Sequence, residues 1–205
     1  ELRTVLVIGE TVDELRDAVA AVDRVSLVDF ADHRNQPTAR DFGPRDGEEL
    51  YLLYTGGTTG YPKGVMWRHD DFFRKPISGG NPYGEARKDY EDLANEVKNF
   101  PSLSFLIAAP LMHGAASYSL FTFISLGGRL ILERDFDAEK IVRNIPRDKT
   151  QMILIVGDAM GMPLVEELEK QAGQVDISTL FSVASGGAIW SKSVRDRLVA
   201  VKPEL

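Results

Sequence analysis

The string YTGGTTGYPKGV, from Tyr54 to Val65, holds the residue types in this chain that are best suited to chemistry. Glycine adds no buried side chain and loses more backbone entropy on folding than any other residue, so a packed core gains little from such a segment. Backbone N–H groups, threonine hydroxyls and the Lys63 ammonium can instead converge on an anion, and phosphate is the usual ligand of such a loop. The spacing therefore predicts a phosphate-binding loop.

Two common phosphate motifs do not match this loop. A Walker loop requires Gly-Lys followed by Ser or Thr, but Pro62 precedes Lys63 and Gly64 follows it. The dinucleotide fingerprint fails as well, because Gly56 and Gly57 are adjacent. A flexible surface turn is the alternative, and it explains a single pair of glycines better than it explains a twelve-residue string of this composition.

The elements that position this loop alternate between strand and helix patterns. A buried strand is expected over 49–55 and a short strand over 64–68, with Asp70 capping the helix that follows. Further strands are expected over 3–9, 25–30, 103–110, 128–133, 150–156 and 179–185, and helices over 11–22, 114–126, 137–145, 161–172 and 191–201. Residues 79–101 combine turn residues with an acidic-basic helix and are expected to form a linker or insertion. Strands of near-continuous hydrophobicity, each followed by a helix, predict an α/β fold of mostly parallel sheets flanked by helices.

Composition narrows the function classes. The chain has 205 residues, of which 43% are hydrophobic and 27% charged, as in ordinary globular proteins. A net charge of −7 argues against a nucleic-acid-binding face. The absence of cysteine excludes disulfides and thiolate metal sites and suits a reducing cytoplasm. The longest apolar stretches, such as LSFLIAAPLM, are far too short for a transmembrane segment.

The string YTGGTTGYPKGV resembles the phosphate loop of the adenylate-forming superfamily, which includes acyl-CoA synthetases, luciferases and peptide-synthetase adenylation domains. Gly56 stands where serine is common, which removes one hydroxyl donor but keeps the backbone N–H. Two later segments, APLMHGAASYSLFTFISLGGRLIL and FSVASGGAIWSKSVRDRL, are similar to further signatures of the family. The resemblance covers nearly the whole chain, and GGTTGYPKGVMWRHDD is most similar to bacterial fatty-acyl and related acyl-CoA synthetases.

This resemblance implies an AMP-forming acid–thiol ligase that uses ATP, Mg²⁺ and CoA. A carboxylic acid, fatty or related lipid, would be converted to an acyl-AMP and then to an acyl-CoA. Contacts to the ATP phosphates are implied for Thr55, Gly56, Gly57, Thr58, Thr59, Gly60 and Lys63. The Thr55 hydroxyl would also be a ligand of Mg²⁺, and Lys63 and His113 would be the catalytic side chains.

The family match assigns two sites outside the loop. His113 would line the acyl-adenylate pocket and orient the carboxylate or adenylate, because a carboxylate is already ionised at pH 7 and needs no general base. The alternative is a satisfied core histidine. Gly186, Gly187 and Ala188 would lie flat against the adenine ring, and a tight strand-to-helix turn explains the same glycines equally well.

The family pattern also predicts the organisation of the chain. Residues 1–100, with the phosphate loop at 54–65, would belong to one α/β subdomain and residues 101–205 to a second. The later family motifs, Tyr-Gly-x-Thr-Glu, Thr-Gly-Asp and a terminal Gly-Lys, are absent from these residues. We therefore expect an internal fragment of the large N-terminal domain, without its N-terminal start or the C-terminal domain and inactive alone.

Three alternatives to a fatty-acyl-CoA synthetase stay open. The parent protein could be an aryl-CoA ligase or a fatty-acyl-AMP ligase, which differ in the acid or in the acceptor. A non-catalytic nucleotide-binding or interaction module is the alternative from another class. A homodimer is compatible with all of them.

Overall fold

The structure, a computed structural model, describes residues 4–7, 13–33, 46–56, 60–82 and 84–205. Contacts between residues divide the chain into two compact units, Glu1–Pro44 and Arg45–Leu205. The predicted division near residue 100 stays a prediction: the four-stranded sheet begins at Ser104, whereas the contacts group Arg45–Leu205 together. Among the described residues, none of the helices combines the length and apolarity needed to cross a membrane.

The first unit is a small β–α–β arrangement. Strands β1 (Thr4–Val7) and β2 (Ser26–Asp29) pair in parallel, and α1 (Asp13–Ala20) lies between them in sequence. A short helix, α2 (Phe30–His33), follows β2 directly. Parallel strands need a crossover connection, and a helix usually supplies it.

The second unit begins with an antiparallel hairpin of β3 (Leu50–Thr55) and β4 (Lys63–Arg68). The predicted ends of both strands are close to these, but the prediction that 49–55 is buried is wrong. Leu50 and Leu52 are 53% and 49% exposed, whereas Tyr51 and Leu53 are partly buried. Side chains alternate between the two faces of a strand, and only one face of this hairpin packs against the described part of the chain.

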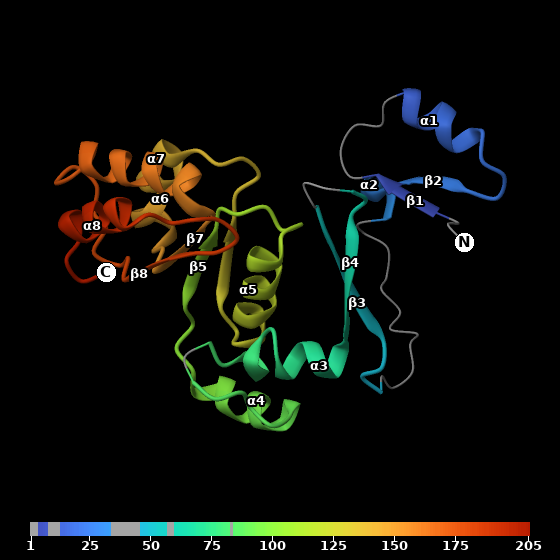
Figure 1. Cartoon of the computed structure of the whole chain (residues 1–205), viewed down its shortest axis with the longest axis horizontal. Helices are drawn as coiled ribbons and strands as arrows, with labels where there is room; N and C mark the ends of the chain where they lie inside the picture. Colours follow the sequence, from blue (N-terminus) through green and yellow to red (C-terminus); the bar gives the residue numbers. More distant parts are fainter. Residues whose placement is uncertain (1–3, 8–12, 34–45, 57–59, 83) are drawn as a thin grey trace. The chain divides into compact units, whose positions relative to one another are not determined.

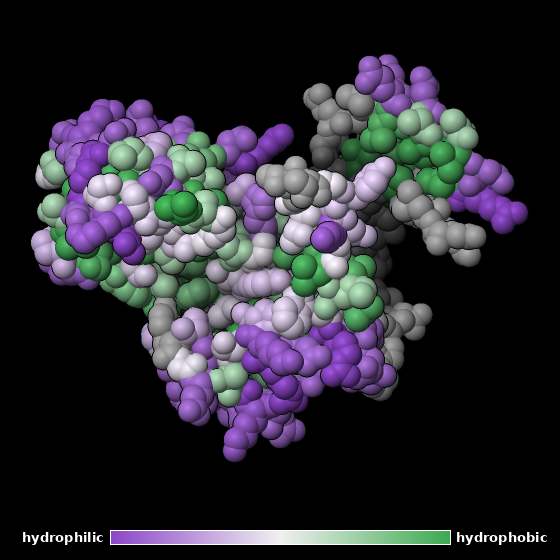
Figure 2. Space-filling view, viewed as in Figure 1, coloured by the Kyte–Doolittle hydropathy of each residue, from purple (hydrophilic) through white to green (hydrophobic). Residues whose placement is uncertain are grey.

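Short helices follow the hairpin. They are α3 (His69–Arg74), η1 (Ser78–Gly80), α4 (Tyr90–Glu96) and η2 (Val97–Asn99). The stretch predicted as a linker or insertion therefore contains an ordered helix, whose N-cap Asp89 accepts from the N–H groups of Glu91 and Asp92. Figure 2 shows hydrophilic residues gathered over α3 and α4. The predicted cap at Asp70 is wrong: α3 begins at His69, and the Asp70 carboxylate pairs with Arg74 instead.

The remaining strands form one parallel sheet in the order β6-β5-β7-β8 (Figure 1). Their bounds are β5 (Ser104–Ile107), β6 (Arg129–Leu132), β7 (Met152–Ile155) and β8 (Ser182–Ser185). The helices are α5 (Gly114–Ser125), α6 (Ala138–Asp148), α7 (Gly157–Lys170) and α8 (Lys192–Val201). Helix α7 begins four residues before the predicted start at 161, directly after its strand.

The two central strands, β5 and β7, are buried on both faces. Leu106 and Ile153 pack in one cluster with α6, α7 and α8, while Phe105 and Leu154 pack in another with α5. This alternation follows from the two-residue period of a strand. Helices thus cover both faces of the sheet, which confirms the predicted α/β fold of mostly parallel sheets flanked by helices.

Candidate functional site

The hairpin brings the two ends of the predicted phosphate loop side by side. Thr55 and Lys63 are the last pair of the β3–β4 register, and the Thr55 hydroxyl donates to the Lys63 carbonyl at 3.2 Å. The connection of residues 56–62 is called the tip loop below. Gly57, Thr58 and Thr59 lie outside the described residues. The strand pairing therefore places the backbone of Lys63 at the mouth of the loop, and its side chain is exposed.

The described glycines of the tip loop have open space around them. A Cβ atom placed on Gly56 or on Gly60 would meet no heavy atom within 4 Å. Gly60 has φ +116°, which favours glycine, and Tyr61 beside it is 95% exposed. The packing of the described residues therefore does not require a glycine at position 56.

His113 lies at the N-cap of α5, after the carboxyl end of β5. Its backbone N–H donates to the Pro110 carbonyl at 3.0 Å, and its own carbonyl accepts from the Ser117 N–H at 3.0 Å. The imidazole does not cap the helix and is exposed. The alternative of a core histidine is therefore wrong.

The turn of Gly186, Gly187 and Ala188, called the β8 turn below, follows the carboxyl end of β8. The Gly186 N–H donates to the Ile155 carbonyl at 3.3 Å, and a Cβ on Gly186 would lie 3.0 Å from the Ala115 Cβ. Gly187 has φ +89°. Neighbouring protein atoms thus already restrict Gly186, so the tight-turn alternative has direct support whether or not adenine also lies there.

Residues at the start of α7 hold the β8 turn from the other side, and sequence reasoning missed them. The Gly157 N–H donates to the Ser185 hydroxyl at 2.8 Å, and Gly157 has φ +55°. A Cβ there would lie 2.6 Å from the Ile189 carbonyl oxygen. Asp158 accepts from the Ser191 N–H at 2.8 Å, with its own N–H donating to Ile189 at 3.0 Å. The only signal in the sequence is a Gly-Asp pair that ends an apolar run.

Strand β3 and the β8 turn both contact the first turn of α5. The Leu53 side chain of β3 lies 3.1 Å from the Cβ position of Gly114, and Gly186 makes its close approach to Ala115. Leu53 is two residues before Thr55, so the hairpin mouth is roughly 7 Å further along β3. The structure therefore brings together the ends of the phosphate loop, the exposed imidazole of His113 and the β8 turn. Ligands of open α/β sheets bind at such carboxyl ends of strands.

Protein groups alone do not make a metal site here. In the ranges that the structure describes, no group of three or more His, Cys, Asp or Glu side chains could hold an ion. Thr55 offers one neutral oxygen, and its hydroxyl hydrogen is directed to Lys63. Mg²⁺ is commonly held by one or two protein ligands together with substrate phosphates, and a single threonine fits only that arrangement.

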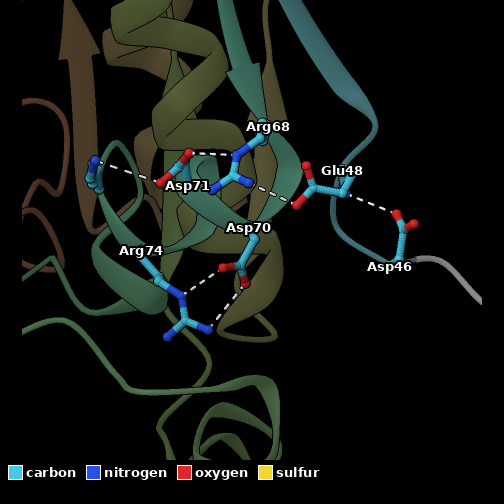
Figure 3. A network of polar contacts seen from close by, with 7 residues as sticks. Asp46, Glu48, Arg68, Asp70, Asp71 and Arg74 are labelled. Carbon is cyan, nitrogen blue, oxygen red and sulfur yellow. Dashed lines mark hydrogen bonds and ion pairs between the residues drawn. The ribbon is translucent and has the colours of Figure 1, made fainter.

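An ionic network fixes the end of the hairpin opposite to the tip loop (Figure 3). Arg68 donates to Asp71 at 2.9 Å and to Glu48 at 2.8 Å, which joins β4 to α3 and to the segment before β3. Asp70 and Arg74 pair within α3 at 2.9 Å. The hydrogen bond from Arg68 holds the pKa of Asp71 below its usual value, and Arg74 does the same for Asp70.

The sequence model of the AMP-binding enzyme family matches residues 3–204. A 3-oxocholest-4-en-26-oate–CoA ligase of Rhodococcus rhodochrous is 41% identical over 170 residues, which are 80% of this chain and 30% of that protein. A medium/long-chain-fatty-acid–CoA/3-oxocholest-4-en-26-oate–CoA ligase of Mycobacterium tuberculosis (strain ATCC 25618 / H37Rv) is 36% identical over 204 residues, 98% of this chain and 36% of that protein. The chain thus spans about a third of the length of these relatives.

Solved structures show the same fold at lower identity. The O-succinylbenzoate Coenzyme A synthetase of Bacillus subtilis in complex with AMP matches with a TM-score of 0.68 and 19% identity, covering 98% of this chain and 37% of that one. The same enzyme in complex with ATP and magnesium ion matches with a TM-score of 0.67 and 19% identity, covering 96% and 37%. The matches confirm the resemblance to adenylate-forming enzymes that the sequence motifs indicated.

Proposed function

Because the chain belongs to the AMP-binding enzyme family, we propose that the protein that carries it activates a carboxylic acid with ATP. The first product is an acyl-AMP and the second an acyl-CoA. One observation carries this proposal: the mouth of the phosphate loop, His113 and the β8 turn converge on the first turn of α5. A fatty or related lipid acid is the proposed substrate, because the relatives are named for such acids.

The tip loop is proposed to bind the β- and γ-phosphates of ATP. The residues proposed for these contacts are Thr55, Gly56, Gly57, Thr58, Thr59, Gly60 and Lys63. The Lys63 ammonium would stabilise the negative charge that develops on pyrophosphate as it leaves. The Thr55 hydroxyl would help to fix the backbone of this lysine through its hydrogen bond to the Lys63 carbonyl.

The reaction has two steps. A carboxylate oxygen attacks the α-phosphorus, the new O–P bond forms, and the bond to the bridging oxygen of pyrophosphate breaks. The CoA thiol then loses its proton to solvent, its sulfur attacks the acyl carbon, and AMP leaves with the electron pair of the C–O bond. His113 is proposed to orient the carboxylate and the adenylate, and Gly186, Gly187 and Ala188 to provide a flat wall for adenine.

Mg²⁺ is proposed to arrive with the triphosphate, with the Thr55 hydroxyl as its ligand from the described part of the chain. When bound, the ion would neutralise phosphate charge. We further propose a cytoplasmic location and a homodimer, and sedimentation of the full-length protein tests the latter.

The test is ATP–pyrophosphate exchange by the full-length protein with fatty, aryl and steroid-like acids, followed by addition of CoA. We expect exchange without CoA and acyl-CoA formation with it. Preference for aryl acids would favour the aryl-CoA ligase, and exchange without acyl-CoA formation would favour the acyl-AMP ligase. ATP binding with no exchange for any acid would overturn the enzyme assignment and favour the non-catalytic module.

A further inference from the structure

The turn Ser78–Gly80 has an unusual backbone. Its three residues have φ of +50°, +59° and +72°, so all three are in the left-handed region. Ser78 carries a side chain, which makes this conformation unfavourable for it. Such a backbone persists only where the surrounding structure enforces it, and it is found mostly at functional sites.

Arg87 and α4 enforce this turn from one side. The Arg87 side chain is only 7% exposed; its Nη1 donates to the Gly79 carbonyl at 3.3 Å, and its Nε and Nη2 both lie 2.7 Å from Glu96 Oε2. A Cβ on Gly79 would lie 2.5 Å from the Arg87 backbone nitrogen, and one on Gly80 3.0 Å from Leu93 Cδ1. A solvated insertion would not need a buried charge, so this one has a positional purpose.

The other side of the turn faces α5 across a cavity of about 190 Å³, which Ser78, Pro82, Ser119 and Thr122 help to line. Ser119 and Thr122 follow Ala115 by four and seven residues and so share its face of α5. Ala115 is the residue that Gly186 approaches. The cavity therefore lies on the side of α5 that leads to the β8 turn, roughly 6–10 Å further along the helix axis.

We propose that Arg87 is a positioning residue for acid selectivity: by holding the left-handed turn against α5, it limits the cavity that receives the body of the acid. This inference rests on the proposed function. A carboxylate held near His113 would direct the rest of the acid along α5 towards Ser119 and Thr122. Removal of the guanidinium would leave space behind Gly79 and Gly80, so the turn could move away from α5 and the cavity could grow.

The experiment compares full-length wild type with Arg87→Ala, Arg87→Lys and Glu96→Gln in exchange assays with straight-chain acids from butanoic to hexadecanoic. In Arg87→Ala we expect the ratio of kcat/KM for long over short acids to rise about tenfold. The KM for ATP should stay within about twofold. Arg87→Lys should have an intermediate effect, because one ammonium cannot reproduce the planar fork that reaches both partners. Glu96→Gln keeps the volume and should shift the ratio even if Arg87→Ala fails to fold.

Arg197→Ala is the matched control, because Arg197 also forms a double contact with a glutamate, Glu169, but joins α7 and α8. Its selectivity ratio should equal that of wild type. If the ratio in the Arg87 and Glu96 variants stays within about twofold of wild type, or moves towards short acids, the inference is wrong while the proposed function stands. If wild type exchanges with no acid, both are wrong.

Discussion

The tip loop and the β8 turn are both glycine-rich segments at strand ends, but their surroundings differ. Around Gly56 and Gly60 the described structure leaves open space, whereas Gly186 approaches Ala115, and the preceding residue, Ser185, accepts a hydrogen bond from the Gly157 N–H. The β3–β4 pairing ends at Thr55 and Lys63, the residues on either side of the tip loop. Neighbouring atoms of the described chain therefore restrict Gly186 and approach neither Gly56 nor Gly60 within 4 Å.

This difference separates two reasons for glycine that look alike in a sequence. A glycine that admits a ligand should matter for activity and little for folding, while a glycine forced by neighbouring backbone should matter for folding first. Substitutions in the tip loop should therefore lower activity more than stability, and substitutions in and around the β8 turn should lower stability more than activity.

Lys63→Ala should lower activity strongly while leaving stability almost unchanged. Without the ammonium at the hairpin mouth, charge on the leaving pyrophosphate is less stabilised, and we expect exchange to fall roughly 10²–10³-fold in the full-length protein. Stability should change by less than about 0.5 kcal/mol, because Lys63 is exposed. Lys192→Ala, which removes an exposed lysine paired with Asp196, is the control and should change neither quantity. Equal exchange by both variants would contradict the phosphate assignment.

Gly157→Ala, in contrast, should lower the stability of the fold. The new Cβ would lie 2.6 Å from the Ile189 carbonyl oxygen and 2.7 Å from the Ala188 Cβ, at a φ of +55°. Because both contacts are rigid, we expect a loss of about 2–4 kcal/mol in the free energy of unfolding, measured by urea denaturation. A variant as stable as wild type would show that the β8 turn is not held by packing.

The same substitution in each segment, glycine to alanine, compares the tip loop with the β8 turn directly. Gly186→Ala places a methyl 3.0 Å from the Ala115 Cβ and should cost about 1 kcal/mol of stability, with a raised KM for ATP. Gly56→Ala meets no neighbour and should change stability by less than about 0.5 kcal/mol while still slowing exchange. If Gly56→Ala unfolds the protein and Gly186→Ala does not, the two segments have been assigned the wrong way round.

Local pattern predicted most elements of the fold, because the period of hydrophobic residues depends on neighbours in sequence. It failed where the outcome depends on distant residues. The apolar run over 49–55 does not reveal that only one face is covered, and Asp70 looks like a cap until Arg74 is seen to pair with it. In the site, the loop motif indicated Thr55 and Lys63.

Other site features could not be predicted from spacing. Gly157 and Ser185, which are 28 positions apart in the sequence, form a hydrogen bond beside the β8 turn. The role of Arg87 can be recognised only from its contacts with Gly79 and Glu96 in the structure. Long-range contacts of this kind leave no periodic signal. A lone glycine at a strand end, or a lone arginine in a charged stretch, has too many ordinary explanations to be singled out.

The smallest expected effect concerns the ionic network at the fixed end of the hairpin (Figure 3). Hydrogen bonds from Arg68 and Arg74 lower the pKa of Asp71 and Asp70 below the ordinary value of 3.8, with Lys75 also attracting Asp71. Carboxyl groups with a lowered folded-state pKa add stability above that ordinary value, and this stability is lost as pH falls through the lowered pKa. Both carboxylates are partly exposed, so the contribution should be small.

We therefore compare Asp71→Asn with wild type by thermal unfolding at neutral pH and again well below pH 3.8. The variant should have the lower Tm at neutral pH, and the difference should shrink in acid, where the wild-type carboxylate is protonated as well. Comparing the two proteins at each pH removes the shared effect of other acidic groups. A Tm difference of the same size at both pH values would mean that Asp71 acts by packing.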